Sequence, residues 1–420
     1  MNFIYNTGLR LYLTAAKFMS PFNNKAKLFY NGRRDLISTI KERLAGNSAK
    51  IIWVHCSSVG EFEQARPLIE RLRELRPELK VLLTFFSPSG YELRKNYQHA
   101  DWVFYLPMDT SSNAKAFVEA VNPTAVVFIK YEFWYNYLRE LKKRGIPTYI
   151  ISAIFRKDQM FFRWYGSFFR KMLSAYHLMF VQDENSLNLL KSIGINNTVI
   201  CGDTRFDRVH EITSNNVQIE VVEKFADGFT TLIAGSSWEP DEKLIADYFE
   251  SVQNLKLVLA PHEVSPDNIK RIETLFANYK VIRYSHLKDV KIDPRLEVRL
   301  RESRILIIDT IGILSSVYRY ASVAYVGGGF GVGIHNILEA ATYGVPVVFG
   351  PKFQKFKEAR DLVDCKGAFS IKTQLELNKV LDDLLINEEN RKTAGAICGS
   401  YVKENLGATS KILSHLKIDS

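Results

Sequence analysis

Beyond about residue 50, short runs of apolar and often β-branched residues alternate with segments whose apolar residues recur at helical spacing. Continuous apolar runs separated by helices are typical of parallel strands buried on both faces of a sheet. The first array of predicted strands comprises Ile51–Val54, Lys80–Phe85, Trp102–Leu106, Ala125–Ile129, Thr148–Ser152, Leu178–Gln182 and Thr198–Cys201. The second array comprises Thr231–Gly235, Lys256–Ala260, Lys280–Arg283, Ile305–Ile308, Val323–Val326 and Val345–Phe349.

Two such arrays predict an α/β protein with two Rossmann-like, doubly wound domains that face each other across a cleft. We expect a basic amphipathic segment over residues 1–30, a first domain over 31–215 and a second over 216–420. Residues 376–417 read as polar helices and are candidates for packing back on the first domain. In doubly wound sheets ligands bind at the carboxyl ends of the strands, so the loops after the strands are the places to search.

The positive charge of the chain is concentrated at its start. Nine basic and two acidic residues in the first 50 positions give +7 of the total net charge of +10. The same segment carries many rings and leucines, but no uninterrupted run of the ~18 apolar residues that a membrane span requires. A basic helix of this kind is typical of one that lies in a membrane interface. The alternative is a helix packed on the body of the protein with its Lys and Arg in water.

The remaining composition excludes several classes of protein. Hydrophobic residues make up 46% and charged residues 24% of the chain, as in soluble globular proteins and unlike disordered or collagen-like chains. The four cysteines are Cys56, Cys201, Cys365 and Cys398. Their wide spacing, without a C-x-x-C pair, argues against a zinc cluster and fits separate thiols in a reducing compartment.

The loop after the first strand, residues 55–63, is the first candidate site. Its small residues and Gly60 open a helix whose first turn contains Glu61. Amide groups at such a turn can bind an anion, and a carboxylate there suits a general base. The alternative is that Glu61 only stabilises the positive end of its helix.

Two further loops of the first array carry polar side chains. Residues 86–91 form a hydroxyl-rich turn before a helix, and residues 130–136 crowd charged and aromatic side chains after a strand. In the second of these, Glu132 fits a binding surface and equally a structural acid paired with Lys130 or an Arg.

A glycine-rich segment over residues 326–333 is the strongest signal in the second array. It has five glycines in seven positions and precedes a predicted helix that contains Asn336 and Glu339. Dense glycine allows backbone to approach a phosphate, and Glu339 could bind vicinal ribose hydroxyls. The segment therefore favours a nucleotide site, the alternative being a flexible turn with a surface acid. The order of its glycines is not that of a dinucleotide fingerprint, and the chain has no Ser-His-Asp order, H-E-x-x-H or P-loop.

Three other loops of this array place hydroxyls, amides or charges at strand ends. They are residues 235–238, 261–263 and 309–312. His262 in the second loop could contact a phosphate or carboxylate, although a lone histidine is more often a local packing residue.

Taken in order, these motifs resemble the 3-deoxy-D-manno-octulosonic acid (Kdo) transferases, glycosyltransferases with the two-domain GT-B architecture. The resemblance is carried by Ser58–Glu61, Ser87–Gly90, Glu132–Trp134, Ser152–Ala153 with Arg156, Gln182–Glu184, Gly202–Asp207, Gly235–Ser237, Pro261–Glu263, Asp309–Thr310, Gly327–Phe330, His335–Glu339, Gly344–Pro346 and Gly350–Pro351. There are departures from the family pattern, above all Asp203 and Arg205 in place of the usual Asn and Lys. Arg keeps the charge of Lys but changes the hydrogen-bond geometry.

The resemblance implies inverting transfer of Kdo from CMP-Kdo to the tetraacylated lipid A precursor in lipopolysaccharide biosynthesis, with Glu61 as the general base. In the first domain it implies substrate contacts from Ser58, Gly60, Ser87, Ser89, Glu132, Arg156 and Arg205. In the second it implies contacts from Gly235, Ser236, Ser237, Pro261, His262, Asp309, Gly328, Gly329, Phe330, Asn336 and Glu339.

The resemblance also implies partners and a location. We expect the protein to be peripheral or monotopic on the cytoplasmic face of the inner membrane, with no cofactor, no metal and no nucleic-acid partner. Residues 152–172, where rings alternate with Arg and Lys, could extend this membrane-facing surface or form an amphipathic helix with buried rings. The alternative functions are another GT-B enzyme, such as a lipid A disaccharide synthase or a nucleotide-sugar epimerase, or a catalytically silent nucleotide-sugar-binding protein.

Overall fold

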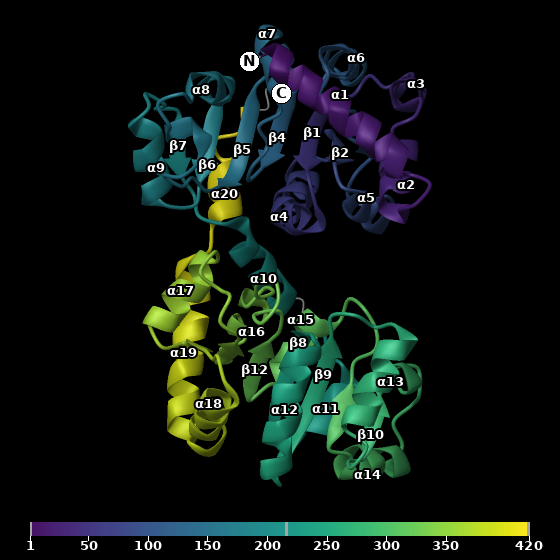
Figure 1. Ribbon diagram of the computed structural model, residues 1–420, viewed down its shortest axis with the longest axis vertical. Coiled ribbons are helices and arrows are strands. Elements are labelled where there is room, and N and C mark those ends of the chain that lie inside the picture. Colours follow the sequence, from purple (N-terminus) through teal and green to yellow (C-terminus); the bar gives the residue numbers. More distant parts are fainter. Residues whose placement is uncertain (1, 215–216, 418–420) are drawn as a thin grey trace. The chain divides into compact units, whose positions relative to one another are not determined.

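The computed structural model describes residues 2–214 and 217–417, which form two compact units (Figure 1). The first unit contains the chain up to Arg208 together with the residues from Leu406 onward, and the second spans Val209–Asn405. Our sequence boundary lay later, at 215/216, within a polar stretch. The first unit ends at Arg208, whose guanidinium lies 3.5 Å from Glu63 and 4.0 Å from Glu70 of the same unit.

The first unit is built on a seven-stranded parallel sheet of order β3-β2-β1-β4-β5-β6-β7. Its strands are β1 (Ile51–Cys56), β2 (Lys80–Phe85), β3 (Trp102–Tyr105), β4 (Ala125–Ile129), β5 (Thr148–Ala153), β6 (Leu178–Val181) and β7 (Thr198–Ile200). The order reverses at β1, so the loops after β1 and β4 emerge side by side at the switch point of a doubly wound sheet.

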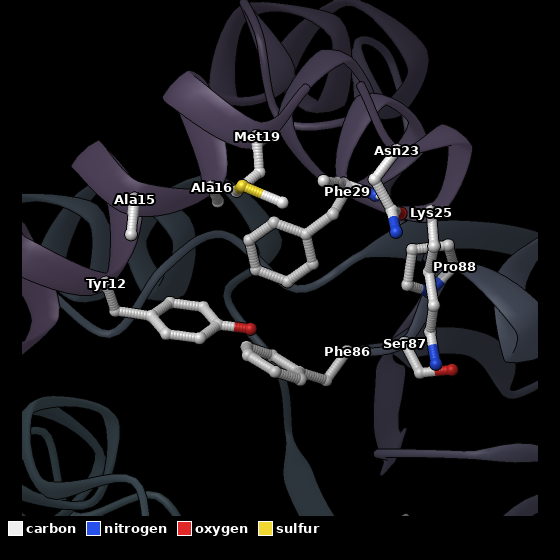
Figure 2. Close-up of a pocket in the computed structure, with 11 residues that line it drawn as sticks. Tyr12, Ala15, Ala16, Met19, Asn23, Lys25, Phe29, Phe86, Ser87 and Pro88 are labelled. Carbon is white, nitrogen blue, oxygen red and sulfur yellow. The ribbon is translucent and has the colours of Figure 1, made fainter. Parts of the chain in front are cut away.

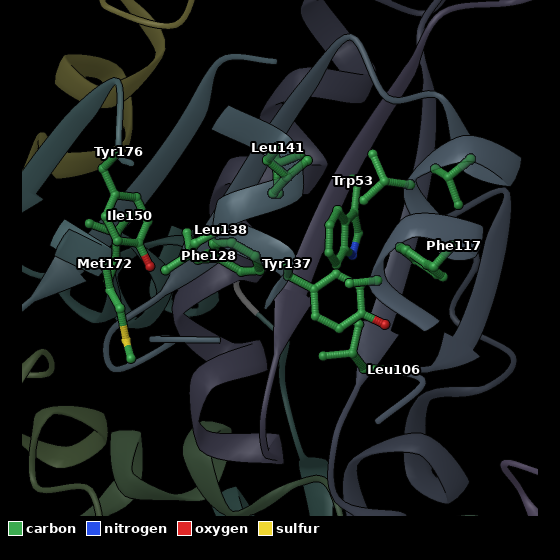
Figure 3. Packing of buried hydrophobic residues seen from close by; sticks show 14 of the residues in the cluster. Trp53, Leu106, Phe117, Phe128, Tyr137, Leu138, Leu141, Ile150, Met172 and Tyr176 are labelled. Atoms are coloured by element: carbon green, nitrogen blue, oxygen red, sulfur yellow. The ribbon is translucent and has the colours of Figure 1, made fainter. Parts of the chain in front are cut away.

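Helices cover both faces of this sheet (Figure 1). They are α1 (Asn2–Met19), α2 (Asn24–Asn31), α3 (Leu36–Leu44), α4 (Val59–Leu75), α5 (Pro88–Arg94), α6 (Ser111–Val121), α7 (Tyr135–Lys143), η1 (Met160–Phe162), α8 (Ser167–Leu173), α9 (Glu184–Lys191) and α20 (Ala408–Leu413). Helix α10 (Thr204–Ser214) begins in this unit and continues into the second. Alternate residues of β1 enter different cores: Trp53 packs among Phe117, Phe128 and Tyr137 on one face (Figure 3), and Ile52 packs on the other.

The second unit repeats the architecture with the parallel order β10-β11-β9-β8-β12-β13-β14. Its strands are β8 (Thr230–Ser237), β9 (Leu255–Pro261), β10 (Val281–Arg283), β11 (Ile305–Ile307), β12 (Val323–Val326), β13 (Val347–Phe349) and β14 (Ala368–Ser370). Its helices are α11 (Glu220–Ala226), α12 (Glu239–Ser251), α13 (Pro266–Leu275), η2 (Tyr284–His286), α14 (Pro294–Glu302), α15 (Leu314–Val317), η3 (Tyr318–Tyr320), α16 (Leu338–Ala341), α17 (Lys357–Asp364), α18 (Gln374–Ile386) and α19 (Glu388–Glu404). The prediction of an α/β protein with two doubly wound sheets is confirmed.

Two local predictions were wrong, and one strand was not predicted. The segment Gly235–Ser237 is the end of β8 rather than a loop, because Ser237 still pairs with Pro261 beyond a register shift. The helix after the glycine-rich segment begins at Leu338 and so does not contain Asn336, because the Asn336 side chain accepts the Leu338 amide at 3.2 Å. The pattern also gave no prediction of the short edge strand β14.

Residues 152–172 form neither one amphipathic helix nor one exposed surface. They are divided between the end of β5, the 3-10 turn η1 and the short helix α8. Phe155 and Phe161 are buried in the core of the first unit, whereas the Trp164 side chain is 91% exposed.

The N-terminal helix α1 is tied to the first unit at its start and exposed at its end. The Tyr5 hydroxyl donates to the Asp109 carboxylate at 2.6 Å, and the Tyr5 ring lies 5.7 Å from that of Tyr135. Further along, Phe18 is 73% exposed, and Phe22 after the helix is 86% exposed. None of the helices in the described ranges combines the length and hydropathy of a membrane span.

Candidate active site

The carboxylate of Glu61 lies in the first turn of α4, directly after β1. Ser58 is the N-cap residue, yet its hydroxyl donates to Glu61 Oε2 at 2.8 Å instead of accepting a backbone amide. Burial raises the pKa of Glu61 above its usual value, and the nearby charge of Glu132 adds to this effect. The hydrogen bond from Ser58 acts in the opposite direction. A half-buried carboxylate with a raised pKa suits proton abstraction near neutral pH.

Glu132, after β4, is a buried acid with its own partners. Its side chain is 2% exposed, and Oε2 accepts a hydrogen bond of 2.5 Å from the Trp134 indole. The same oxygen lies 3.4 Å from His55 Nε2, and the Tyr176 hydroxyl donates to the backbone carbonyl of Glu132. The acid therefore accepts a hydrogen bond from Trp134 and faces His55, two neighbours that the sequence did not suggest.

His55 is a residue of this site that the sequence reasoning did not select. It is fully buried at the end of β1, and its Nδ1 lies 2.8 Å from the hydroxyl of Thr84 on β2. Its Nε2 faces Glu132. The available signal was one polar residue in an otherwise apolar strand, immediately before the turn that carries Glu61.

A cationic cluster lies in the same unit. Arg205 makes a 2.8 Å ion pair with the buried Asp203, which also accepts hydrogen bonds from Gln64 and Gln182. Although burial alone would raise it, the pKa of Asp203 is lowered by the charge and hydrogen bonds of Arg205. The two positions that depart from the family pattern thus pair with each other.

Tyr131 connects this pair with Arg156. The Arg156 guanidinium lies 5.8 Å from the Tyr131 ring centroid. Burial raises the pKa of the Tyr131 hydroxyl, while the charges of Arg156 and Arg205 both act to lower it. Two of the predicted substrate-binding arginines therefore act electrostatically on one tyrosine hydroxyl, and Arg156 also lies over its ring. Lys130, the residue before it, has a positive φ of 66°, a conformation that costs energy in a non-glycine residue.

Other predicted contacts of the first unit have structural roles as well. The Ser87 hydroxyl accepts the Gly90 amide at 3.3 Å as the N-cap of α5, and it lies 2.6 Å from the Ser89 hydroxyl. Gly60 is exposed in the first turn of α4.

In the second unit, the glycine-rich segment is packed against neighbouring backbone. A Cβ on Gly327 would lie 2.3 Å from the Ser236 carbonyl oxygen, and one on Gly329 would lie 2.6 Å from Gly350 Cα. The amides of Gly327, Gly328, Gly331 and Gly333 donate to acceptors of the protein, that of Gly328 to the Asp241 carboxylate at 3.0 Å. The glycines thus allow close contact between backbone segments of this unit, and these four amides already donate hydrogen bonds within the protein.

The end of β8 is equally constrained. The Ser237 hydroxyl donates to the buried Glu242 at 2.9 Å, and a Cβ on Gly235 would collide with the Tyr318 hydroxyl. Ser236 lies between them with a positive φ of 52°. Strained backbone of this kind often accompanies a binding site, and here it turns the strand toward the loop at residues 326–333.

Three aromatic rings are stacked at the carboxyl ends of β8, β9 and β12. The His262 ring, next to Pro261, lies 4.6 Å from the rings of both Trp238 and His335. The Trp238 indole nitrogen lies 3.3 Å from His335 Nε2. Burial, assisted by the charge of His262, lowers the pKa of His335 to about 4, so this imidazole is neutral at pH 7.

The remaining predicted residues separate into two groups. Asn336 donates to the Glu339 carboxylate at 3.1 Å, so these two side chains act as a pair, and Phe330 is half-buried nearby along the chain. Asp309 instead accepts hydrogen bonds from the Ser285 amide and hydroxyl, at 2.8 and 2.5 Å.

Comparison with known proteins finds relatives that match most of the chain. Residues 36–208 match the family model described as 3-deoxy-D-manno-octulosonic-acid transferase (kdotransferase). The 3-deoxy-D-manno-octulosonic acid transferase of Aquifex aeolicus is 27% identical over 364 residues, covering 83% of this chain and 92% of the relative. That of Haemophilus influenzae is 26% identical over 387 residues, covering 87% and 86%.

Solved structures show the same fold at lower identity. The UDP-GlcNAc 2-epimerase of Neisseria meningitidis, bound to UDP-GlcNAc, superposes with a TM-score of 0.60 at 16% identity. The match covers 87% of this chain and 98% of the epimerase chain. The fold is the two-Rossmann-domain GT-B architecture, as predicted.

Proposed function

We propose that the donor of this chain is CMP-Kdo. The premise is its sequence similarity to Kdo transferases, which are glycosyltransferases of lipopolysaccharide biosynthesis. The proposed acceptor is a hydroxyl of the tetraacylated lipid A precursor, and the anomeric configuration is inverted. The similarity to Kdo transferases supports the transfer of Kdo. The partly buried Glu61 carboxylate, held by Ser58, is the observation that carries the mechanism.

In this mechanism Glu61 accepts the proton of the attacking hydroxyl. The hydroxyl oxygen forms a bond to the anomeric carbon of Kdo as the bond from that carbon to the phosphate oxygen breaks. The electron pair leaves with CMP, and the transition state has oxocarbenium character. Glu132 is the less suitable base, because its carboxylate is already bound by Trp134 and faces His55. Its charge contributes instead to the raised pKa of Glu61.

The cations of the first unit supply the charge stabilisation. Arg156 lies over the Tyr131 ring and the charge of Arg205 acts on the same hydroxyl, and we assign both arginines to the negative charge of the Kdo carboxylate and the departing phosphate. Arg205 is held by Asp203, so it is oriented in advance. The proposal includes no metal, since these cations provide the electrostatic stabilisation.

The second unit is assigned to the nucleotide. The Asn336–Glu339 pair suits the ribose hydroxyls and the adjoining phosphate, since a carboxylate can accept from two vicinal hydroxyls. The neutral His335 and its stacked neighbours His262 and Trp238 provide flat surfaces at the carboxyl edge of the sheet. Four amides of the glycine-rich segment already donate hydrogen bonds within the protein, so any contact of this segment with the phosphate uses its other groups.

The acceptor determines the location. We propose that the protein is bound peripherally or monotopically to the cytoplasmic face of the inner membrane, where its lipid acceptor lies. The basic residues and exposed rings of the first 30 positions support this placement. Nucleic acid is not a proposed partner.

The decisive experiment is incubation with CMP-Kdo and the tetraacylated lipid A precursor, with the product read by mass spectrometry. The unmodified protein should add Kdo. Glu61→Gln should lower turnover by about 10²–10⁴-fold, because the amide cannot accept the proton, and leave CMP binding unchanged. Glu74→Gln, an exposed acid of the same helix, is the matched control and should remain active. Near-normal turnover of Glu61→Gln would remove Glu61 as the base, and no product from the unmodified protein would overturn the proposed reaction.

A further inference from the structure

A pocket of about 510 Å³ lies in the first unit between α1, α2 and the loop after β2. Its wall is largely apolar and includes Tyr12, Ala16, Met19, Phe29 and Phe86. Figure 2 shows Met19 above the Phe29 ring and the rings of Tyr12 and Phe86 around the same space. Small-molecule sites have volumes of this order and apolar walls with few polar groups.

The floor of the pocket is fixed before any ligand arrives. The Arg33 guanidinium lies 3.9 Å from the Phe29 ring centroid and 5.0 Å from that of Phe86. It also donates to the Phe86 carbonyl at 2.6 Å and to the Leu106 carbonyl at 2.9 Å. Burial lowers the pKa of Arg33 to about 10, because its guanidinium is shielded from solvent. A pre-organised apolar floor reduces the entropy cost of binding.

One side of the pocket is polar and carries a positive charge. Lys25 and Asn23 from the start of α2 lie there together with Ser87 from the opposite loop (Figure 2). An apolar interior beside an ammonium group complements a ligand with a long apolar chain and an anionic head. Fatty acyl chains on a phosphorylated head group have this chemistry.

The pocket contacts the loop that carries Glu61. Ser87 lines the pocket, and its amide donates at 2.9 Å to the carbonyl of Ser57, the residue before Ser58. The Phe86 ring also lies 4.9 Å from that of Trp134, which donates to Glu132. A head group at the polar side of this pocket is therefore next to the loop that carries Ser58 and Glu61.

We infer that this pocket binds one fatty acyl chain of the lipid acceptor and so positions the head group for reaction. The inference rests on the proposed function, because it assigns a subsite to the proposed acceptor. It makes the pocket a determinant of specificity for acylated over deacylated acceptors. Bulk phospholipid is the competing occupant, and the experiment separates the two.

The first experiment fills the pocket. Ala16→Trp places an indole in it from α1, and Thr14→Trp adds the same ring at an exposed position of the same helix, outside the pocket. With Ala16→Trp we expect the KM for the tetraacylated acceptor to rise by about tenfold or more, since several methylenes lose their burial. Turnover of a fully deacylated, phosphorylated acceptor should stay unchanged in both variants. Equal kinetics of the two variants on the acylated acceptor would overturn the inference.

A second experiment does not depend on turnover or on the substituted helix. The unmodified full-length protein is irradiated with an acceptor analogue that carries a diazirine at the end of an acyl chain, and cross-links are mapped by mass spectrometry. Cross-links to the pocket residues Tyr12, Ala16, Met19, Phe29, Phe86 and Ser87, competed by unlabelled acceptor and not by excess phosphatidylglycerol, support the inference. Cross-links competed equally by both lipids, or confined to Phe18 and Phe22, would overturn it. If these cross-links form but no Kdo is transferred, the reaction fails while the pocket assignment stands.

Discussion

At the scale of single residues, the pKa of Glu61 is the quantity on which the proposed chemistry depends. Burial and Glu132 raise this pKa, and the Ser58 hydroxyl opposes them through one hydrogen bond. A base must be ionised to act, so a raised pKa means that activity is lost as the pH falls toward it. Ser58 therefore extends activity toward lower pH.

Ser58→Ala tests this balance. Without the hydroxyl the ionised form of Glu61 loses a stabilising hydrogen bond, and its pKa rises further. We expect the acid limb of the pH profile of kcat/KM to move to higher pH, with activity at alkaline pH nearly retained. Ser57→Ala alters the same loop without removing that hydrogen bond, so its profile should match the unmodified protein. An unmoved acid limb in Ser58→Ala would contradict the role of Glu61 as the titrating base.

At the scale of elements, the glycine-rich segment joins β12 to its neighbours by backbone contact. Gly329 lies against Gly350 after β13, and Gly327 lies against the end of β8. The segment therefore holds three strand ends together. Its glycines are required by this packing, whether or not the segment also binds a ligand.

Gly329→Ala tests this requirement. A Cβ at 2.6 Å from Gly350 Cα cannot be accommodated without moving backbone, so we expect the free energy of unfolding to fall by about 1–3 kcal/mol. In Gly331→Ala the nearest atom to the new Cβ is 3.5 Å away, an ordinary contact. That control should change stability by less than about 0.5 kcal/mol in the same urea titration. Equal stabilities would mean that the segment is not tightly packed.

The sequence predicted most strands, since apolar periodicity reports burial directly. It failed at two local features: the Asn336 side-chain oxygen accepts the Leu338 amide ahead of α16, and the backbone of Ser237 continues β8 through a shift in register. For the site, the turn predicted Glu61, and dense glycine predicted a close backbone approach. The pattern could not show which backbone approaches, nor that His55 faces Glu132, because both depend on pairings between distant segments.

At the scale of the whole molecule, charge and exposed rings coincide at the N-terminal end. The first 50 residues carry a net charge of +7, and Phe18 and Phe22 stand exposed near Lys17 and Lys25. Each basic residue near an anionic surface contributes about 1 kcal/mol of attraction, and exposed rings add burial in the interface. Membrane binding should thus have both a salt-dependent and an apolar component.

The double variant Phe18→Glu/Phe22→Glu should bind vesicles containing anionic lipid at least about tenfold more weakly, as measured by co-sedimentation. Leu375→Glu, a substitution of another exposed apolar residue in the second unit, is the control and should bind normally. Raising the ionic strength should weaken binding of the unmodified protein as well. Equal binding of the double variant and the control would show that these rings do not enter the membrane.

The return of the chain to the first unit has a consequence for biosynthesis. Helix α20 places Ile412 in the core of that unit, and Asp207 fastens it by accepting the amides of Gly407 and Thr409 at 2.7 Å each. These residues leave the ribosome only after all of the second unit. The first unit to emerge is thus the last that can be completed, because the place of Ile412 in its core is filled only after the second unit has been synthesised.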